Sequence, residues 1–480
     1  MFNHTAASGQ ADKSVLDKVV PGYYHRRSAT GAIETSTCCQ NVATEHAMGQ
    51  KLMVDSVVSW ARNYRVDGFR FDLMGHHSRE NMLAVRAALD ALTLAKDGVD
   101  GSSIYLYGEG WNFGEVADNA LFTQATQGQL GGTGIGTFSD RLRDAVRGGG
   151  PFDDDPRKQG FGSGLATDPN GDAANGDAAQ AAKTLAHDTD LVELGLAGNL
   201  RTFTFRSAES GKQVAGTQVD YNGSPAGYAD QPDEVVTYVD AHDNETLFDA
   251  LTYKLPVGTS MADRVRMNTL SLATTALSQT PSFWHAGADL LRSKSLDRDS
   301  YDSGDWFNRL DWTGADNGFG HGLPPEGSNA AKWPYMKPLL ADPALKPTAS
   351  DVATASAMAQ DLLRLRFSSP LFRLGSADLI RQKVSFPVSG TADAHPGVIV
   401  MRIDDTVGPD VDPALRGLVV VFNASPKAVT QKVAGLSGPV DLSPVQAKGA
   451  DPVVKSAAYD ASASTLTVPA RTVAVFVQTR

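Results

Sequence analysis

At 480 residues the chain is long enough for two or more domains with a large core, although a barrel with insertions can absorb most of that length. A net charge of −12 and the lack of a basic patch argue against a protein that binds nucleic acid through its phosphates. No apolar run approaches the roughly 18 residues of a membrane span, and the N-terminus lacks the charged start and apolar core of a signal peptide.

Helix-like and strand-like patterns alternate up to about residue 290. Residues 53–64 place apolar side chains three or four apart, which predicts an amphipathic helix. In FRFDL, residues 69–73, apolar and charged side chains alternate, which predicts a strand whose two charges leave the same face. A helix-like stretch follows over residues 79–98, and the apolar run over residues 103–110 predicts a strand buried on both faces.

The alternation then continues in the same sense. A predicted strand at residues 134–138 precedes a helix-like stretch at residues 139–149. Another strand at residues 233–243 precedes helix-like stretches that include residues 264–279, and a strand at residues 280–287 closes the series. This order predicts a parallel sheet with crossover helices.

Two regions break this pattern. Residues 148–180 are rich in Gly, Asp and Ala, which predicts a surface excursion that is partly flexible. From about residue 376 the chain contains short β-rich runs such as VIVMRI and LVVVFNA, which are typical of a small antiparallel sandwich. We therefore expect an α/β barrel domain over residues 1–375, with an insertion around 150–233, and a C-terminal β-sandwich over residues 376–480.

The two cysteines, Cys38 and Cys39, are adjacent. They cannot join distant segments of the chain, and without further cysteines nearby they make a poor metal site. The pattern favours a small buried or loop-lining pair over a vicinal disulfide with a local role.

Three carboxylates end three separate predicted strands: Asp72, Glu109 and Asp243. In a (β/α) barrel the C-terminal ends of the strands form the face on which active sites are built. Converging carboxylates repel one another, so such a group suits acid, base or nucleophile chemistry, or a metal. The alternative is that each carboxylate only caps the following helix. Because three carboxylates follow three strands in the same way, we favour a shared site over three separate caps.

Other residues that could take part in catalysis or substrate binding are also expected close to these strand ends. Two histidines and an arginine belong to this set: His4, His242 and Arg70. Aromatic residues are also frequent here: Tyr107, Trp111, Trp284 and Trp306. Side chains that can bind hydroxyl groups, together with aromatic rings, are typical of sugar-binding sites. We therefore favour sugar chemistry over metal-dependent hydrolysis as the function of this site.

Several motifs resemble the α-amylase superfamily of retaining glycoside hydrolases, in the family's order. DGFRFDLMG, YGEGW and YVDAHDNETL resemble its second, third and fourth conserved regions, and FNHTAASG resembles the end of the first. STCCQNVATEH and PSFWHAGADLLRSKSLDRDSYDSGDWFN are similar to bacterial pullulanases and limit dextrinases. The resemblance implies a (β/α)8 barrel followed by a β-sandwich.

The resemblance also implies roles for the site residues. Asp72 matches the nucleophile, Glu109 the general acid/base, and Asp243 the carboxylate that stabilises the transition state. Arg70 would keep Asp72 ionised and oriented, because an adjacent positive charge favours the carboxylate. His4 and His242 match histidines that bind the sugar at the cleavage point. Four weaker matches to substrate contacts, for which packing or a loop cap is the alternative, are Trp111, Asn41, Asp305 and Asn308.

The implied reaction is cleavage of α-1,6-glucosidic bonds in pullulan, amylopectin and limit dextrins by double displacement with retention. The chemistry requires no cofactor and leaves the metal-site residues unknown. Calcium is compatible with the resemblance as a structural ion, and the FDDDP turn at residues 152–156 could bind it, although a solvated acidic turn is favoured. An α-glucan is the expected partner, with neither nucleic acid nor a membrane span.

The chain departs from the family pattern at its start. It begins inside the first conserved region, the upstream signature YNWGYDP is missing, and five clear parallel strands are found where a closed barrel has eight. We therefore expect a chain truncated at its N-terminal strands. Two alternatives remain for its function: a silent C-terminal fragment that at most binds glucan, or an α-1,4-specific amylase. Secretion or cell-surface display is slightly favoured over the cytoplasm, and the sequence leaves the oligomeric state open.

Overall fold

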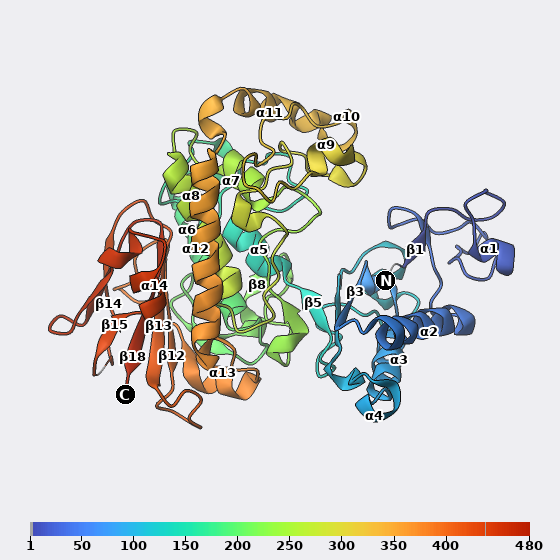
Figure 1. Cartoon of the computed structure of the whole chain (residues 1–480), viewed down its shortest axis with the longest axis horizontal. Coiled ribbons are helices and arrows are strands. Elements are labelled where there is room, and N and C mark those ends of the chain that lie inside the picture. Colours follow the sequence, from blue (N-terminus) through green and yellow to red (C-terminus); the bar gives the residue numbers. More distant parts are fainter. Residues whose placement is uncertain (1–2, 437) are drawn as a thin grey trace. The chain divides into compact units, whose positions relative to one another are not determined.

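The computed structural model describes residues 3–436 and 438–480, and these form two compact units. The first unit comprises the described residues up to Phe138 together with Tyr228–Val236, and the second comprises Ser139–Gly227 and Thr237–Arg480 (Figure 1). No helix in the described part of the chain has the length and apolar character to cross a membrane.

The first unit is built on a four-stranded parallel sheet in the order β10-β5-β4-β3. Its strands are β3 (Gly68–Phe71), β4 (Tyr105–Gly108), β5 (Gly136–Phe138) and β10 (Val235–Val236). Four of the five predicted parallel strands are thus present. β10 is much shorter than the predicted 233–243, so Asp243 follows a loop and does not end the strand as predicted. The fifth, at residues 280–287, is only an isolated parallel bridge between Ser282 and Thr237 in the second unit. The described residues of the first unit form an open sheet, and the barrel architecture stays a prediction.

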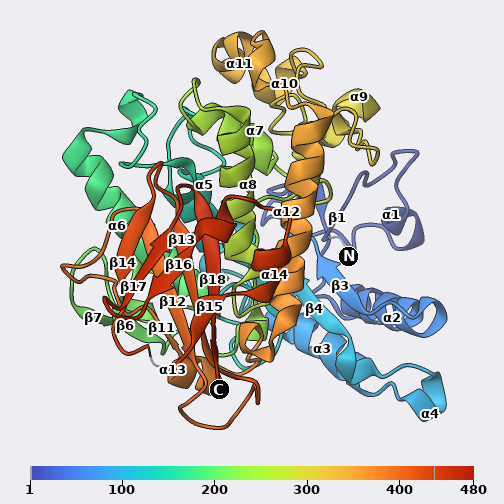
Figure 2. The same cartoon turned by 60° about the vertical axis from the view of Figure 1, so that its left-hand side comes forward.

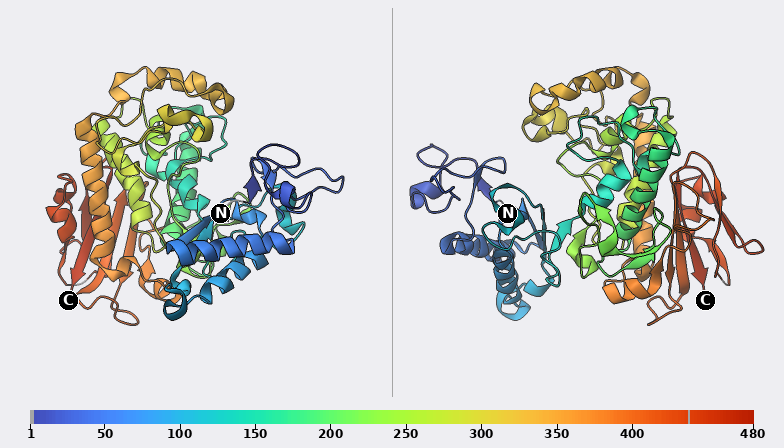
Figure 3. Two further views of the ribbon diagram at one scale, coloured as in Figure 1. Left: turned by 45° about the vertical axis from the view of Figure 1, so that its right-hand side comes forward. Right: turned by 180° about the vertical axis from the view of Figure 1, so that it is seen from behind.

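Two helices cover this sheet, and they pack side by side (Figure 3, left). They are α2 (Ala47–Tyr64), which begins earlier than the predicted residue 53, and α3 (Arg79–Asp90). Their buried faces meet the strand residue Phe71 in one core: Met53, Val57 and Ala61 from α2, and Met82, Val85 and Leu89 from α3. The three-to-four spacing of these residues is what makes both segments helical in this position.

The single helix predicted over residues 79–98 is wrong, because the segment forms two helices. α3 ends at Asp90, and α4 (Leu94–Asp97) starts anew after Thr93. The hydroxyl of Thr93 accepts a hydrogen bond from the backbone N–H of Lys96, and this N-cap fixes the break. The remaining elements of the unit are α1 (Leu16–Val19) and the antiparallel pair β1 (His4–Thr5) and β2 (Gln40–Asn41).

Helices dominate the first part of the second unit. The long helix α12 (Ala349–Ser368) lies beside α8 (Met261–Ala276), as Figure 1 shows in orange and yellow-green. The other helices are α5 (Asp140–Arg147), α6 (Ala178–Leu196), α7 (Leu247–Lys254), α9 (Gly304–Asn308), α10 (Glu326–Asn329), α11 (Trp333–Leu340), α13 (Ala377–Lys383) and α14 (Pro444–Lys448). Two small hairpins join β6 (Thr204–Arg206) to β7 (Gln213–Ala215) and β8 (Asp220–Tyr221) to β9 (Ser224–Pro225).

The C-terminal region is rich in β-sheet, as the sequence predicts. A five-stranded antiparallel sheet has the order β11-β12-β13-β18-β15, and a three-stranded sheet has the order β14-β17-β16 (Figure 2). Their bounds are β11 (Val384–Ser385), β12 (Val398–Asp404), β13 (Leu415–Asn423), β14 (Val429–Lys432), β15 (Val440–Leu442), β16 (Ala458–Asp460), β17 (Thr465–Val468) and β18 (Thr472–Thr479).

The five-stranded sheet is buried on both faces. On β13, Val419 and Val421 face the core shared with the three-stranded sheet, whereas Leu418, Val420 and Phe422 belong to the core built with the helices. Side chains alternate between the two faces of a strand, so both sets must be apolar. This explains why LVVVFNA reads as a continuous hydrophobic run.

The prediction of a surface excursion over residues 148–180 is wrong in part. Phe161 and Leu165 of this segment lie in the main core of the second unit, and the side chain of Gln159 is buried. The amide of Gln159 donates to the carbonyls of Ser163 and Asp168, so the loop satisfies its own buried polar groups. The glycine-rich composition predicted turns in this segment but gave no sign that Phe161 and Leu165 would be buried in the core.

Candidate active site

The register of β3 and β4 brings two of the predicted carboxylates together. Phe71 pairs with Gly108, so Asp72 and Glu109 occupy the next positions beyond the two parallel strands. Gly108 is required for this close approach, because a Cβ there would lie 2.5 Å from the carbonyl oxygen of Phe71. Both carboxylates thus leave the same edge of the sheet, as the sequence predicts.

Arg70 bridges the two carboxylates. One guanidinium nitrogen lies 2.5 Å from Asp72 Oδ1, and the other lies 3.1 Å from Glu109 Oε2. The backbone N–H of Leu73 also donates to Glu109 Oε2, at 2.8 Å. The side chains of Asp72 and Glu109 are 17% and 11% exposed, so solvent screens this charged group little. A planar guanidinium with several donors can orient both carboxylates at once.

His4 joins this cluster from β1. Its Nδ1 lies 3.5 Å from Asp72 Oδ2 and 2.8 Å from the side-chain oxygen of Asn3. The structure therefore brings four predicted site residues together in the first unit: His4, Arg70, Asp72 and Glu109.

Asp243 and His242 belong to the second unit, where both side chains are largely exposed. Their side chains are 63% and 65% exposed, and His242 Nε2 lies 3.5 Å from Asp243 Oδ1. Lys294 supports the loop that carries them, because its buried side chain donates a hydrogen bond to the carbonyl oxygen of His242 at 2.9 Å. Burial lowers the pKa of Lys294, although Asp249 beside it opposes that shift. A lysine that supports the backbone in this way carries no sequence signal that would have identified it.

Two further carboxylates near this loop escaped the sequence analysis. Asp240 accepts a hydrogen bond from the backbone N–H of Leu247 at the start of α7, and it lies 3.2 Å from His285 Nδ1. Asp249 is fully buried, and burial raises its pKa to about 6 despite hydrogen bonds from Ser293 and from two backbone N–H groups. Both residues hold the polypeptide around the loop, so their role in the described contacts is structural.

The four weaker substrate matches divide into different environments. Trp111 is half-buried, two residues beyond Glu109, and its carbonyl packs closely on Gly75. Asp305 is exposed on α9. Asn308 donates from its amide to the carbonyls of Ser300 and Gly304, which is the loop-capping arrangement. The fourth, Asn41, is fully buried.

Asn41 belongs to a buried polar network that the sequence analysis missed. Its amide nitrogen donates to Glu115 at 2.9 Å, and its amide oxygen accepts from Thr37 at 2.6 Å. Glu115 also pairs with the buried guanidinium of Arg26 at 2.8 Å, and Arg26 pairs with Glu45 at 2.9 Å. Because Asn41 lies opposite His4 in the pairing of β1 with β2, this network fixes the strand that positions His4.

The network makes stability depend on pH. Burial alone would raise the pKa of Glu115, but hydrogen bonds from Ser36, Arg26 and Asn41 outweigh it and lower the pKa from 4.5 to about 2. A carboxylate with a lowered pKa in the folded state stabilises the fold above its unfolded pKa. This contribution is lost as the pH falls from about 4.5 through about 2.

We therefore expect Glu115→Gln to lower the free energy of unfolding at pH 7, with a smaller difference from the wild type at pH 3. Urea unfolding at both pH values, monitored by tryptophan fluorescence, measures the two differences. Asp55→Asn is the matched control, because Asp55 pairs with Lys51 on an exposed helix face and should change stability little. A constant difference between the wild type and Glu115→Gln at the two pH values would contradict the expectation.

Cys38 and Cys39 form a vicinal disulfide, so the favoured prediction of a simple buried or loop-lining pair is wrong. The exposed Cys38 side chain lies on a loop that Thr37 ties to the backbone of Cys39. Adjacent positions in a chain do not reveal whether their two sulfurs are oxidised, so the sequence could not decide this point.

The FDDDP turn is tied down by protein groups. Asp153 accepts from the backbone N–H of Gly150, Asp155 pairs with Arg157, and the ammonium of Lys332 contacts the carbonyl oxygens of Asp153 and Asp154. Across residues 3–436 and 438–480, the one group of three or more His, Cys, Asp or Glu side chains close enough to hold a metal ion is His4, Cys38 and Cys39, and the FDDDP residues are not part of it. Calcium at FDDDP stays a prediction.

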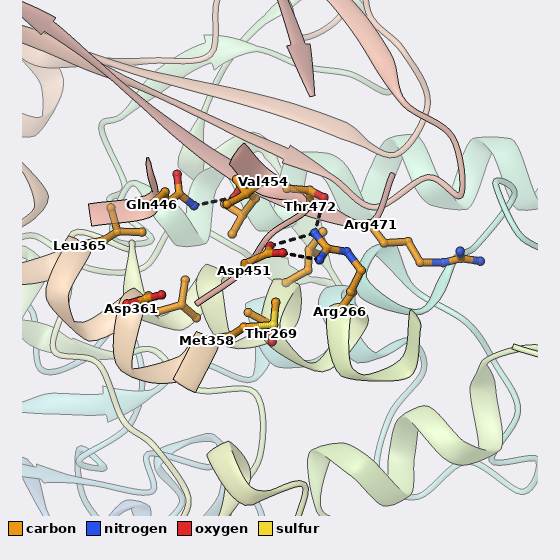
Figure 4. Close-up of a pocket in the computed structure, with 13 residues that line it drawn as sticks. Arg266, Thr269, Met358, Asp361, Leu365, Gln446, Asp451, Val454, Arg471 and Thr472 are labelled. Carbon is orange, nitrogen blue, oxygen red and sulfur yellow. Dashed lines mark hydrogen bonds and ion pairs between the residues drawn. The ribbon is translucent and has the colours of Figure 1, made fainter. Parts of the chain in front are cut away.

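A small cavity in the second unit lies between α8, α12 and the β-rich region, and none of the predicted site residues lines it (Figure 4). Its volume of about 30 Å³ has room for water molecules but not for a sugar ring. The charges that line it are paired, since Arg266 contacts both carboxylate oxygens of Asp451, at 2.8 and 3.1 Å, and the hydroxyl of Thr472. The cavity is therefore a packing seam and not a candidate substrate site.

Comparisons with known proteins show which proteins this chain resembles. Residues 314–479 match the family described as alpha-1,6-glucosidases, pullulanase-type, C-terminal. Pullulanase 1, chloroplastic, from Arabidopsis thaliana is 47% identical over an alignment that covers 100% of this chain and 50% of that protein. A pullulanase from Klebsiella pneumoniae is 42% identical, with 99% of this chain and 42% of that protein covered.

A solved structure agrees in fold as well as in sequence. The maltotriose complex of PulA from Klebsiella pneumoniae superposes with a TM-score of 0.91 at 41% identity, over 99% of this chain and 50% of that chain. The chain thus spans about half the length of the relatives it matches. The motifs, the fold and the relatives together show that this chain belongs to the pullulanase-type family of the α-amylase superfamily.

Proposed function

We propose that this chain carries the reacting carboxylates of a starch-debranching glycoside hydrolase, which cleaves α-1,6-glucosidic bonds in pullulan, amylopectin and limit dextrins. The observation that carries the proposal is the Arg70 bridge between Asp72 and Glu109 at the ends of adjacent parallel strands. The pullulanase relatives support the substrate class, and the Klebsiella structure with maltotriose is a complex with a short glucan.

The proposed mechanism is double displacement with retention of anomeric configuration. Asp72 attacks the anomeric carbon and forms a covalent glycosyl ester, while protonated Glu109 donates its proton to the leaving glycosidic oxygen. Glu109 then removes a proton from the water that hydrolyses the ester, and Asp72 is released as a carboxylate. Asp243 is assigned to the stabilisation of the transition state through its match to the family motif.

Arg70 orients the two reacting carboxylates. Its two contacts hold Asp72 and Glu109 in one orientation, which favours attack and protonation on the same bound sugar. The contact of His4 with Asp72 places the imidazole where it can bind a hydroxyl of that sugar. These residues lie on a strand, at strand ends and on a paired segment, so rigid elements position the whole group.

A second candidate is glucan binding without hydrolysis. The observation that favours it is the open sheet of the first unit, in which β3 is the outermost of four described strands and carries Arg70. An unpaired strand edge exposes backbone hydrogen-bonding groups and offers less support to the residues that follow it. Under this candidate the chain binds α-glucan but does not release reducing ends.

The test is the release of reducing ends from pullulan by the purified 480-residue chain, with Asp72→Asn as the inactive control. We expect maltotriose as the product and no comparable release from amylose. The anomer first formed, followed by NMR, should be α if the mechanism retains configuration. Faster release from amylose than from pullulan would instead support an α-1,4-specific amylase. No release, together with retardation in a pullulan-containing gel, would favour the binding-only candidate.

A further inference from the structure

Three side chains that can ligate a metal ion lie close together, and one of them, His4, contacts the proposed nucleophile Asp72. A ring nitrogen of His4 and the sulfur atoms of Cys38 and Cys39 all lie within 4.8 Å of one another. His4 lies on β1 and the cysteines lie on the loop that enters β2, and the antiparallel pairing of these two strands holds the segments together. The cluster is therefore fixed by local structure and not by chance proximity of loose loops.

The cluster is accessible from solvent. Cys38 is exposed, whereas Cys39 and His4 are half-buried, so small reagents can reach the sulfur atoms. In the oxidised form described here the two sulfurs bind each other, and a disulfide offers no thiolate to a cation. The same atoms become ligands only after reduction.

We propose that reduction of the Cys38–Cys39 disulfide opens a binding site for one thiophilic divalent cation of the Zn²⁺ type, with both thiolates and the His4 imidazole as ligands. In the first step a dithiol reductant gives two electrons and two protons to the disulfide and itself becomes a disulfide. In the second step the cation replaces the two thiol protons, which go to solvent. Two thiolates and one imidazole suit a soft cation, and a water molecule would complete a tetrahedral set.

The position of His4 links this site to the proposed chemistry. His4 Nδ1 lies 3.5 Å from Asp72 in the oxidised form. A cation on Nδ1 would displace this contact, and a cation on Nε2 would occupy the imidazole that is assigned to the sugar. Reduction together with cation binding is then expected to weaken hydrolysis. This consequence rests on the proposed function, whereas the cation site itself does not.

The test compares cation binding by the oxidised and the reduced 480-residue chain. The chain is reduced with a dithiol, freed of reductant without air, and titrated with Zn²⁺ against a chromophoric chelator. We expect the reduced chain to hold one equivalent of Zn²⁺ that the oxidised chain does not hold. Titration with Co²⁺ should add a near-ultraviolet thiolate-to-cobalt absorption in the reduced chain alone. Equal binding by both forms would overturn the proposal, and this comparison requires no variant that could fail to fold.

Variants then identify the ligands. Cys38→Ser, Cys39→Ser and His4→Asn should each weaken Zn²⁺ binding by the reduced chain at least tenfold. His187→Asn is the matched control, because His187 lies in the second unit against Glu209 and should leave binding unchanged. Retention of the extra equivalent by both serine variants would also overturn the proposal.

An activity measurement separates this proposal from the proposed function. If the chain hydrolyses pullulan, Zn²⁺ should inhibit the reduced form more than the oxidised form. If the chain does not hydrolyse pullulan, the proposed function fails, while the difference in Zn²⁺ binding still decides whether the site exists.

Discussion

Glu109→Gln is expected to lower kcat for the hydrolysis of pullulan by about 10²- to 10⁴-fold, the usual contribution of a general acid or base. Glutamine retains the shape of the side chain and can still accept from the backbone N–H of Leu73. It cannot donate a proton to the glycosidic oxygen or remove one from water. Asp72→Asn should lower kcat at least as strongly, because an amide cannot form the glycosyl ester.

An activated substrate separates the two roles. α-Maltotriosyl fluoride needs no proton at its leaving group, so Glu109→Gln should still form the glycosyl ester from it. Azide needs no general base, and it should restore turnover of this variant and give the α-glycosyl azide. Asp72→Asn should give no α-azide, because it cannot form the ester that azide attacks.

The matched control is Glu80→Gln, since Glu80 is an exposed carboxylate on α3 outside the cluster. It should hydrolyse pullulan at the wild-type rate. Pullulan kinetics, fluoride release and NMR of the azide product measure the three expectations. Wild-type activity in Glu109→Gln, or an α-azide product from Asp72→Asn, would contradict the assigned roles.

The sequence predicted best where a side-chain period and a charge pattern coincide. In FRFDL the alternation placed Arg70 and Asp72 on one face of a strand, and the structure joins them at 2.5 Å. The end of β4 placed Glu109 beside them for the same reason, since parallel neighbours in register end at one edge. Local rules are sufficient here because the strands are short and adjacent.

The sequence predicted least where distant segments supply the support. The network of Arg26, Glu115 and Asn41 joins residues up to 89 positions apart, and no local pattern reports such a contact. Lys294 likewise supports His242 from 52 positions away. The break after α3 was missed for another reason: the apolar spacing continues through residues 92–94, and the single Thr93 was not read as an N-cap. Threonine suits a cap better than a helix interior. Helix length was thus decided by one side-chain hydrogen bond.

A second large effect concerns the buried ion pair of Lys383 and Asp405 in the C-terminal region. Both side chains are fully buried, and the Lys383 ammonium lies 2.8 Å from Asp405 Oδ1 and 2.5 Å from the carbonyl oxygen of Val407. The carboxylate also accepts from the backbone N–H groups of Val411 and Asp412. The pair ties the end of α13 to the turn between β12 and β13.

Lys383→Met should lower the free energy of unfolding by about 3–5 kcal/mol at pH 7, because it leaves the Asp405 charge buried without its main partner. Lys383→Met combined with Asp405→Asn should cost less than the sum of the two single changes, since the second change removes the stranded charge. Burial alone would raise the pKa of Asp405, but the hydrogen bonds from Lys383 and the two backbone N–H groups lower it. The pair therefore stabilises the fold above the unfolded pKa of the carboxylate, and this contribution is lost as the pH falls through the lowered folded value.

Urea unfolding of the wild type, the two single variants and the double variant measures this coupling. Lys432→Met is the matched control, because Lys432 is exposed at the end of β14 and its replacement should change stability by about 0.5 kcal/mol at most. If Lys383→Met changes stability no more than this control, the buried pair does not hold α13 to the sheet. A loss of unfolding free energy that shrinks when Asp405→Asn is added would show that the buried carboxylate deprived of Lys383, and not the loss of lysine packing, causes the destabilisation. Arg480, whose guanidinium lies 3.6 Å from Asp405 Oδ2, is present in all four proteins.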